Sequence, residues 1–238
     1  MAVFPPTRHS VIERMRSADT DTRRQAFGDL VEGYWKPLYK YLRIHWQATH
    51  DVAQEWTQAF FSEALQKEWL SRYEPEKARF RTFIRLCADR FVMNARQSAS
   101  RVKRGGNVEV LSLDFPAAEE EMVQHRLTAA PDAEEFFRQE FVRTLFERAV
   151  GKVRSEYAAA GRDVPLTLFE RYDIDPSPDV SYASLAQEFG LTPAQVTNYL
   201  AQIRRSFRMH ALDALRGLCG TPDEYRREAR ELFGVEIE

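Results

Sequence analysis

The chain has 238 residues, with 34 Lys and Arg against 36 Asp and Glu, a formal net charge of −2. This length suffices for one or two domains with buried cores, and a hydrophobic content of 44% excludes a largely disordered chain. No apolar run approaches the roughly 18 residues of a membrane span, and the first residues lack the apolar stretch of a secretory signal. Because Cys87 and Cys219 make no metal-type spacing, the sequence predicts a reduced, cytoplasmic protein with no membrane contact.

The near-zero net charge hides a strong segregation of charge along the chain. Residues 72–104 hold ten basic and three acidic side chains, a net +7, and residues 105–140 hold two basic and nine acidic side chains, a net −7. A basic block of this kind is typical of a surface that binds nucleic acid. The alternative is a solvated helical face that is balanced by the acidic segment after it.

Helical periodicity dominates the first hundred residues, and strand signals are scarce. Helices are predicted over 21–45 (with an interruption at Pro37), 51–65 and 80–101, with a loop at 71–79. These elements make up a predicted helical domain over residues 1–104.

An acidic segment without periodicity follows, and RGGN at 104–107 ends the preceding helical pattern. We interpret 105–130 as a flexible acidic linker. A second helical domain is predicted over 131–218. Residues 219–238 form a C-terminal helical tail whose apolar stripe we expect to pack on that second domain, and binding of an inhibitor or accessory protein is the alternative. The predicted fold class is all-α: two helical domains joined by a flexible acidic linker, the second ending in a helix-turn-helix.

The segment Tyr182–Arg208 carries the most specific pattern in the chain. Apolar residues at helical spacing flank Gly190, which permits a left-handed turn, and Thr192 caps the second helix with Pro193 at its first position. This arrangement is typical of a helix-turn-helix, although an ordinary helical hairpin with a polar face is the alternative. Outward amides, hydroxyls and arginines suit base edges and phosphates. The predicted DNA-binding residues are Thr192, Gln195, Thr197, Asn198, Gln202, Arg204, Arg205 and Arg208.

Three stretches, in this order, resemble bacterial RNA polymerase sigma factors of the extracytoplasmic-function (ECF) group of the sigma-70 family. DVAQEWTQAFFSEAL (51–65) is similar to the family's helix that binds core polymerase. FRTFIRLCADRFVMNARQ (80–97) resembles the helix that opens and reads the −10 promoter element, and residues 182–208 resemble the helix-turn-helix that reads the −35 element. KRGG and LSLD, within 103–114, resemble a subgroup that carries these motifs after the −10 helix.

The resemblance implies a protein without enzymatic activity, cofactor or metal, which binds core RNA polymerase and promoter DNA and directs promoter recognition, DNA melting and transcription initiation. It assigns polymerase contacts to Asp51, Gln54, Glu55, Trp56 and Gln58. It assigns −10 DNA contacts to Tyr73, Lys77, Arg79, Arg81, Arg85, Arg90, Asn94 and Arg96. Further phosphate contacts fall to Arg101, Lys103 and Arg104.

The polymerase-binding stretch departs from the family pattern, because Gln54 and Ala59 stand where the family has acidic residues. Phosphorylation of Thr57 would add a charge of about −1.5 to −2 between them. A phosphorylation site at Thr57, served by a Ser/Thr kinase, is therefore a hypothesis; the alternative is a neutral surface threonine. An anti-sigma factor is another possible regulator. The acidic residues of the linker, Asp114 or 119–121, either mimic nucleic-acid charge or form a solvated spacer.

Two other classes of protein remain open. A helix-turn-helix regulator would bind duplex DNA by itself and use its amino-terminal half for dimerisation or sensing. A partner-binding adaptor would explain the acidic linker but not the basic block. An enzyme is poorly supported, since His45, His50, Asp51 and Glu55 lack the spacing of facing metal ligands, and no glycine-rich phosphate loop precedes a helix.

Overall fold

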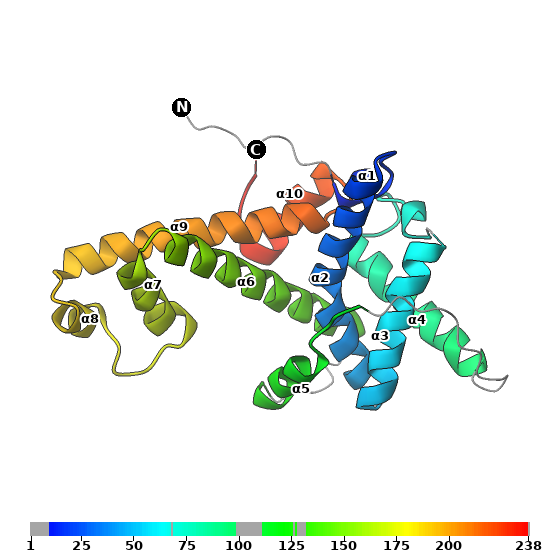
Figure 1. The fold of residues 1–238 in the computed structure, drawn as a ribbon, viewed down its shortest axis with the longest axis horizontal. Coiled ribbons are helices and arrows are strands. Elements are labelled where there is room, and N and C mark those ends of the chain that lie inside the picture. Colours follow the sequence, from blue (N-terminus) through cyan, green and yellow to red (C-terminus); the bar gives the residue numbers. More distant parts are fainter. Residues whose placement is uncertain (1–9, 68, 99–110, 126, 128–131, 238) are drawn as a thin grey trace. The chain divides into compact units, whose positions relative to one another are not determined.

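The computed structural model describes residues 10–67, 69–98, 111–125, 127 and 132–237. Within these ranges every regular element is a helix and there is no strand, so the predicted all-α class is confirmed (Figure 1). None of the helices in these ranges is long and apolar enough to cross a membrane. The chain divides into two compact units: unit 1 is Met1–Thr144 with Leu215–Glu238, and unit 2 is Leu145–Ala214.

The elements follow one another in chain order through the two units. Unit 1 contains α1 (Val11–Met15), α2 (Thr20–Ile44), α3 (His50–Gln66), the 3-10 turn η1 (Trp69–Arg72), α4 (Phe80–Ser98), α5 (Phe115–Gln124), the start of α6 (Ala133–Ala159), the end of α9 (Pro193–Leu218) and α10 (Pro222–Phe233). Unit 2 contains the rest of α6, α7 (Asp163–Phe169), the π-helical turn η2 (Glu170–Ile174), α8 (Tyr182–Glu188) and most of α9.

Helix α2 forms the centre of the core of unit 1. Asp19 caps its first turn, and the helix continues through Pro37 instead of being interrupted there. The ring of Tyr34, 1% exposed, packs at centroid distances of 5.8 Å from Phe80 on α4 and 5.0 Å from Phe141 on α6. This aromatic contact joins three helices and fixes where α4 begins.

The core of unit 2 is formed by three helices, α6, α8 and α9, and by a segment whose role the sequence does not indicate. Val153 and Tyr157 of α6 pack with apolar residues of α8 and α9. The Gly- and Pro-containing stretch from 158 to 180 folds into α7 and η2, and it contributes Leu168 and Phe169 to this core. That stretch is therefore part of the packed unit rather than a connection between helices.

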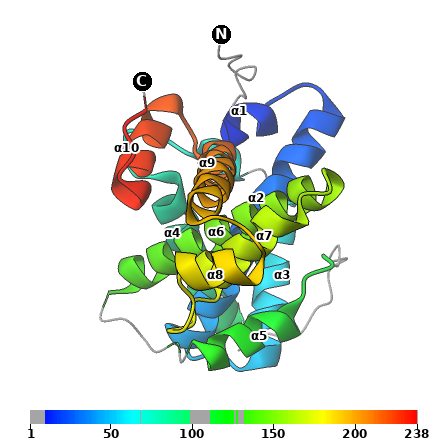
Figure 2. The same ribbon diagram turned by 90° about the vertical axis from the view of Figure 1, so that its left-hand side faces the viewer.

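The predicted flexible linker is wrong over its central part. Residues 115–124 form helix α5, which Figures 1 and 2 both place beside α2. Asp114 caps this helix, and the ring of Phe115 lies 5.4 Å from that of Trp35 and 5.0 Å from that of Tyr39. The prediction gave weight to the many carboxylates and missed a short apolar repeat of Phe115, Ala118 and Met122. These three residues are buried and form the packed side of the helix. The remaining linker residues, 105–110, 126 and 128–130, lie outside the described residues.

The predicted domain boundaries also differ from the observed division. Residues Ala133–Thr144 of α6 belong to unit 1, although the second domain was predicted to begin at 131. The C-terminal tail belongs to unit 1 as well, and the ring of its Tyr225 lies 4.8 Å from the guanidinium carbon of Arg216, a residue of the predicted second domain. Its helix α10 lies against the start of α4 (Figure 2).

Candidate nucleic-acid interface

A groove of about 860 Å³ runs along the outer face of α4 in unit 1. The end of α3, the loop before α4 and α4 itself form its walls. Three of the residues predicted to bind −10 DNA line it, namely Lys77, Arg90 and Asn94. The groove is thus the place in unit 1 where part of the predicted site comes together.

The groove combines unpaired positive charge with aromatic surface. Within the described residues no carboxylate pairs with Arg72 or Arg90, and both side chains are exposed. Phe83 and Phe91 are half-buried and line the same groove. Proteins that bind single-stranded nucleic acid combine exposed arginines with aromatic faces. The arginines bind the phosphates, and the bases stack on the aromatic rings. The site prediction missed Arg72 and Phe91, which the sequence indicated only as part of the basic block and of a helical face.

Tyr73, which was predicted to contact −10 DNA, is not available for stacking. Its side chain is 3% exposed and packs edge-on against Phe80 at a centroid distance of 5.0 Å. Its hydroxyl lies 2.9 Å from the Ala78 carbonyl oxygen and 3.1 Å from a Glu224 carboxylate oxygen. The prediction fails because an aromatic residue in a loop was taken to be exposed, whereas α10 covers this one.

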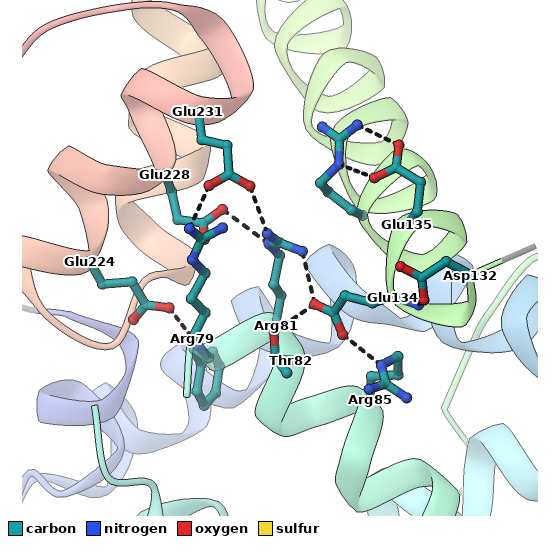
Figure 3. A network of polar contacts seen from close by, with 12 residues as sticks. Arg79, Arg81, Thr82, Arg85, Asp132, Glu134, Glu135, Glu224, Glu228 and Glu231 are labelled. Atoms are coloured by element: carbon teal, nitrogen blue, oxygen red, sulfur yellow. Dashed lines mark hydrogen bonds and ion pairs between the residues drawn. The ribbon is translucent and has the colours of Figure 1, made fainter. Parts of the chain in front are cut away.

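Three of the arginines predicted to bind −10 DNA are ion-paired within the protein (Figure 3). Arg81 is 4% exposed, and its guanidinium lies 3.1–3.2 Å from the carboxylates of Glu134, Glu228 and Glu231. Arg79 pairs with Glu228 at 3.2 Å and with Glu231 at 2.5 Å. These two arginines therefore hold α10 and α6 against α4, and neither offers a free charge to DNA in this structure.

Arg85 is engaged in the same way. It pairs with Glu134 at 2.7 Å and, one turn further along α4, with Asp89 at 2.8 Å. Of the basic residues that were predicted to follow DNA along α4, only Arg90 and Arg96 therefore have exposed side chains.

Arg96 lies between two tryptophans at the other end of α4. Its guanidinium carbon is 4.8 Å from the ring centroid of Trp46 and 5.7 Å from that of Trp56. It also donates a hydrogen bond of 2.8 Å to the Trp46 carbonyl oxygen. A residue predicted to bind DNA thus contacts one predicted to bind polymerase, and the cation–π contacts orient both.

The predicted polymerase-binding residues of α3 divide into free and engaged positions. Asp51 and Glu55 are exposed, and Gln54 is half-buried. Gln58 is engaged, because its side-chain amide exchanges hydrogen bonds of 3.4 and 3.2 Å with the backbone of Leu111. Helix α3 therefore presents two exposed carboxylates, and the chain segment before α5 lies beside Gln58.

The structure is at odds with the hypothesis of phosphorylation at Thr57. Its side chain is fully buried, and its hydroxyl donates a 2.7 Å hydrogen bond to the Ala53 carbonyl oxygen, one turn earlier on α3. A kinase has no access to this hydroxyl, and a buried phosphate would lack compensating charge. The helical register explains the error, since position 57 falls on the inner face of α3.

The three predicted phosphate contacts Arg101, Lys103 and Arg104 lie outside the described residues.

In unit 2, α8 and α9 are joined by a tight turn with the predicted geometry. Gly190 has φ 63°, the left-handed conformation that glycine favours. The Leu191 N–H donates to the Ala186 carbonyl at 2.8 Å, a bond that ends α8 in a Schellman motif. Thr192 and Gln195 then exchange hydrogen bonds of 3.2 and 2.8 Å as a capping box at the start of α9.

The outer face of the start of α9 is polar and exposed. Val196, Leu200 and Ile203 of this helix are fully buried in the core of unit 2. Their neighbours point outward, so most of the predicted DNA-reading residues share one accessible side. The exposed residues are Thr192, Gln195, Thr197, Asn198, Gln202, Arg205 and Arg208.

Arg204 is the exception among these predicted DNA contacts. Its guanidinium binds the Asp173 carboxylate at 2.8 and 3.0 Å and the Tyr182 hydroxyl at 3.0 Å, and it lies over the ring of Tyr172. The hydrogen bonds to Asp173 raise the pKa of the Arg204 guanidinium. Arg204 therefore joins η2 and α8 to α9, a role that the sequence did not indicate because Asp173 lies in the unassigned stretch.

Among the residues that the structure describes, no group of three or more His, Cys, Asp and Glu side chains is placed to hold a metal ion. Comparisons of the chain with protein-family models, with curated proteins and with solved structures give no match.

Proposed function

We propose that the protein is a sigma factor of the ECF type, which binds core RNA polymerase and directs it to promoters. The proposal rests on the resemblance of three stretches in a fixed order. The structural observation that carries it furthest is the groove on α4, because a basic, aromatic groove suits an unpaired DNA strand. A protein that binds only duplex DNA does not need such a groove.

In this proposal each unit has a separate contact with the promoter. The α8–α9 pair acts as a helix-turn-helix, and the exposed amides at the start of α9 read base edges in the major groove of the −35 element. Arg72, Arg90 and Asn94 hold the unpaired strand of the −10 element, while Phe83 and Phe91 offer stacking faces. Asp51 and Glu55 on α3 meet basic residues of the polymerase.

The test is co-elution of the full chain with core polymerase, followed by run-off transcription from fragmented genomic DNA. We expect a stable complex and a limited set of transcripts. Arg90→Ala should keep polymerase binding and lower promoter opening, measured by permanganate reactivity of unpaired thymines. Arg24→Ala, an exposed arginine that does not line the groove, is the matched control and should leave opening unchanged.

A second candidate is a helix-turn-helix regulator that acts without polymerase. The pairing of Arg79, Arg81 and Arg85 favours it, because three arginines of the basic block then serve the fold of unit 1. This candidate predicts tight binding of the isolated chain to duplex DNA and no complex with core polymerase. A sigma factor predicts the reverse, so one binding experiment with each partner separates them.

A further inference from the structure

The start of α4 is surrounded by carboxylates from helices far along the chain (Figure 3). Three of them, Glu224, Glu228 and Glu231, project from α10, and we call this set the α10 carboxylates. Glu224 accepts a hydrogen bond from the backbone N–H of Phe80, the first residue of α4, and another of 2.7 Å from the N–H of Gly220. Glu228 and Glu231 bind the two arginines at and beside that helix end.

This is the arrangement in which proteins bind phosphate groups. A helix N-terminus presents free N–H groups and a partial positive charge, and adjacent arginines add charge-assisted hydrogen bonds. Here a helix start and the guanidinium groups of Arg79 and Arg81 converge on one small region. Carboxylates of the same chain occupy the positions that anionic oxygens of a ligand would take.

The contact of α10 with α4 depends largely on charge. Tyr225 and Ala229 are the only apolar side chains of α10 that are buried. Burial raises the pKa of the Glu228 carboxyl, although Arg81 and Arg79 act against this shift. Keeping this carboxylate charged and away from water therefore costs free energy. A polyanion outside the protein can replace the pairs of Arg79 and Arg81 while Glu228 returns to water.

We propose that α10 is a built-in competitor of nucleic acid: the α10 carboxylates occupy the sites on Arg79 and Arg81 that bind DNA phosphates, and α10 and DNA exclude one another there. The inference rests on the proposed function for the identity of the polyanion as DNA. In the free chain the groove on α4 is open, while the adjoining arginines are covered. Release of α10 extends the basic surface from the groove to the start of α4.

The experiment measures binding of the purified full chain, without polymerase, to a fluorescent single-stranded oligodeoxynucleotide by anisotropy. Glu231→Gln removes one negative charge at a partly exposed position, so the fold is retained. We expect it to tighten binding about three- to tenfold, the effect of about one freed charge-assisted contact. The log–log dependence of affinity on salt should steepen by about 0.7 for each added phosphate contact.

The matched control is Asp223→Asn, which removes one charge from the same helix at a side chain that is 85% exposed and pairs only with Arg226 among the described residues. It should bind the oligonucleotide as the wild type does. Adding Arg79→Gln to Glu231→Gln should abolish the gain, because the gain requires the released arginine.

Equal affinity and equal salt dependence of Glu231→Gln and wild type would overturn the inference and make α10 a fixed part of unit 1. A gain that Asp223→Asn shares, or that survives Arg79→Gln, would overturn it as well, since it would reflect net charge alone. A different result would contradict the proposed function, namely that the chain forms no complex with core polymerase.

Discussion

At the scale of single residues, the side chains of greatest consequence are those whose partners lie elsewhere in the sequence. Arg204 and Arg205 are neighbours on α9 with the same chemistry. Arg204 binds Asp173 and Tyr182, whereas Arg205 is exposed. Their sequence context does not show which of the two arginines is held by the fold; only the tertiary partners of Arg204 do.

Arg204→Ala should lower the free energy of unfolding by about 1 kcal/mol, because its ion pair with Asp173 is partly exposed and screened by solvent. Arg205→Ala, its neighbour, should leave stability unchanged and weaken binding to duplex DNA. Urea unfolding and a duplex-binding assay check both variants. Equal stability of the two would contradict the structural role of Arg204.

Gly190→Ala should destabilise unit 2 by about 1–2 kcal/mol, since φ is 63° and a Cβ is strained in that conformation. No atom lies within 4 Å of the added Cβ, so the loss is conformational and not steric. Gly151→Ala is the control: its site on α6 is equally open, and it should gain about 0.5–1 kcal/mol from higher helix propensity. Thermal unfolding distinguishes the two signs.

At the scale of elements, the docking of α5 on α2 combines its apolar repeat with ion pairs. Glu119 binds the Arg43 guanidinium with both carboxylate oxygens and accepts a hydrogen bond from the Tyr39 hydroxyl. Glu121 pairs with Lys36 and Lys40 of the same face of α2. Two of the acidic residues that were predicted to mimic nucleic acid or to form a spacer, Glu119 and Glu121, therefore bind α2, whereas Asp114 caps α5 and Glu120 is exposed.

The docking of α5 should weaken in acid. The hydrogen bond from Arg43 lowers the pKa of the Glu119 carboxyl below its usual value of 4.5. The stabilisation is therefore fully present above 4.5 and is lost as the pH falls through the lowered pKa. In Glu119→Gln the free energy of unfolding should not show this decrease in acid. Urea unfolding from neutral to acidic pH measures it. If the variant loses stability in acid as the wild type does, Glu119 does not stabilise the folded state.

At the scale of the whole molecule, the segregation of charge in the sequence is largely neutralised by tertiary contacts. The acidic segment pairs with basic residues of α2 through α5, and with α4 through Glu134. Other carboxylates that pair with the start of α4 come from α10, and Asp89 of α4 itself pairs with Arg85. Part of the basic block is therefore balanced internally, and in the groove Lys77 pairs with Glu74, whereas Arg72 and Arg90 have no carboxylate partner among the described residues.

Lys40 is the clearest case of a charge that the fold requires. It is 1% exposed and lies 2.8 Å from Glu121 of α5 and 3.0 Å from Glu140 of α6, so it joins three helices. Lys40→Met should cost about 3 kcal/mol of unfolding free energy, because the buried carboxylate of Glu140 then keeps only Arg143 as a cationic partner. Lys36→Met, at a partly exposed lysine that shares Glu121, should cost less than about 1 kcal/mol. Similar losses in denaturant unfolding would contradict this difference.

The sequence by itself determined the helical class and the turn between α8 and α9. Apolar periodicity, the cap at Thr192 and the glycine at 190 are local signals, and they act over a few residues. Arg90 and Asn94, which the family resemblance assigned to −10 DNA, both line the groove. That assignment came from the resemblance and not from helical periodicity, and DNA binding there stays a prediction.

Only the tertiary structure decided which charges are free, that 115–124 is a docked helix, and that the C-terminal helix covers Tyr73 and Arg81. Arg81 and Glu228 are 147 residues apart, and Tyr73 and Glu224 are 151 apart. Helical periodicity predicts which side of a helix faces inward, but not which distant segment packs there. Ion pairs between buried groups form only after that packing has excluded water, so no local pattern reports them.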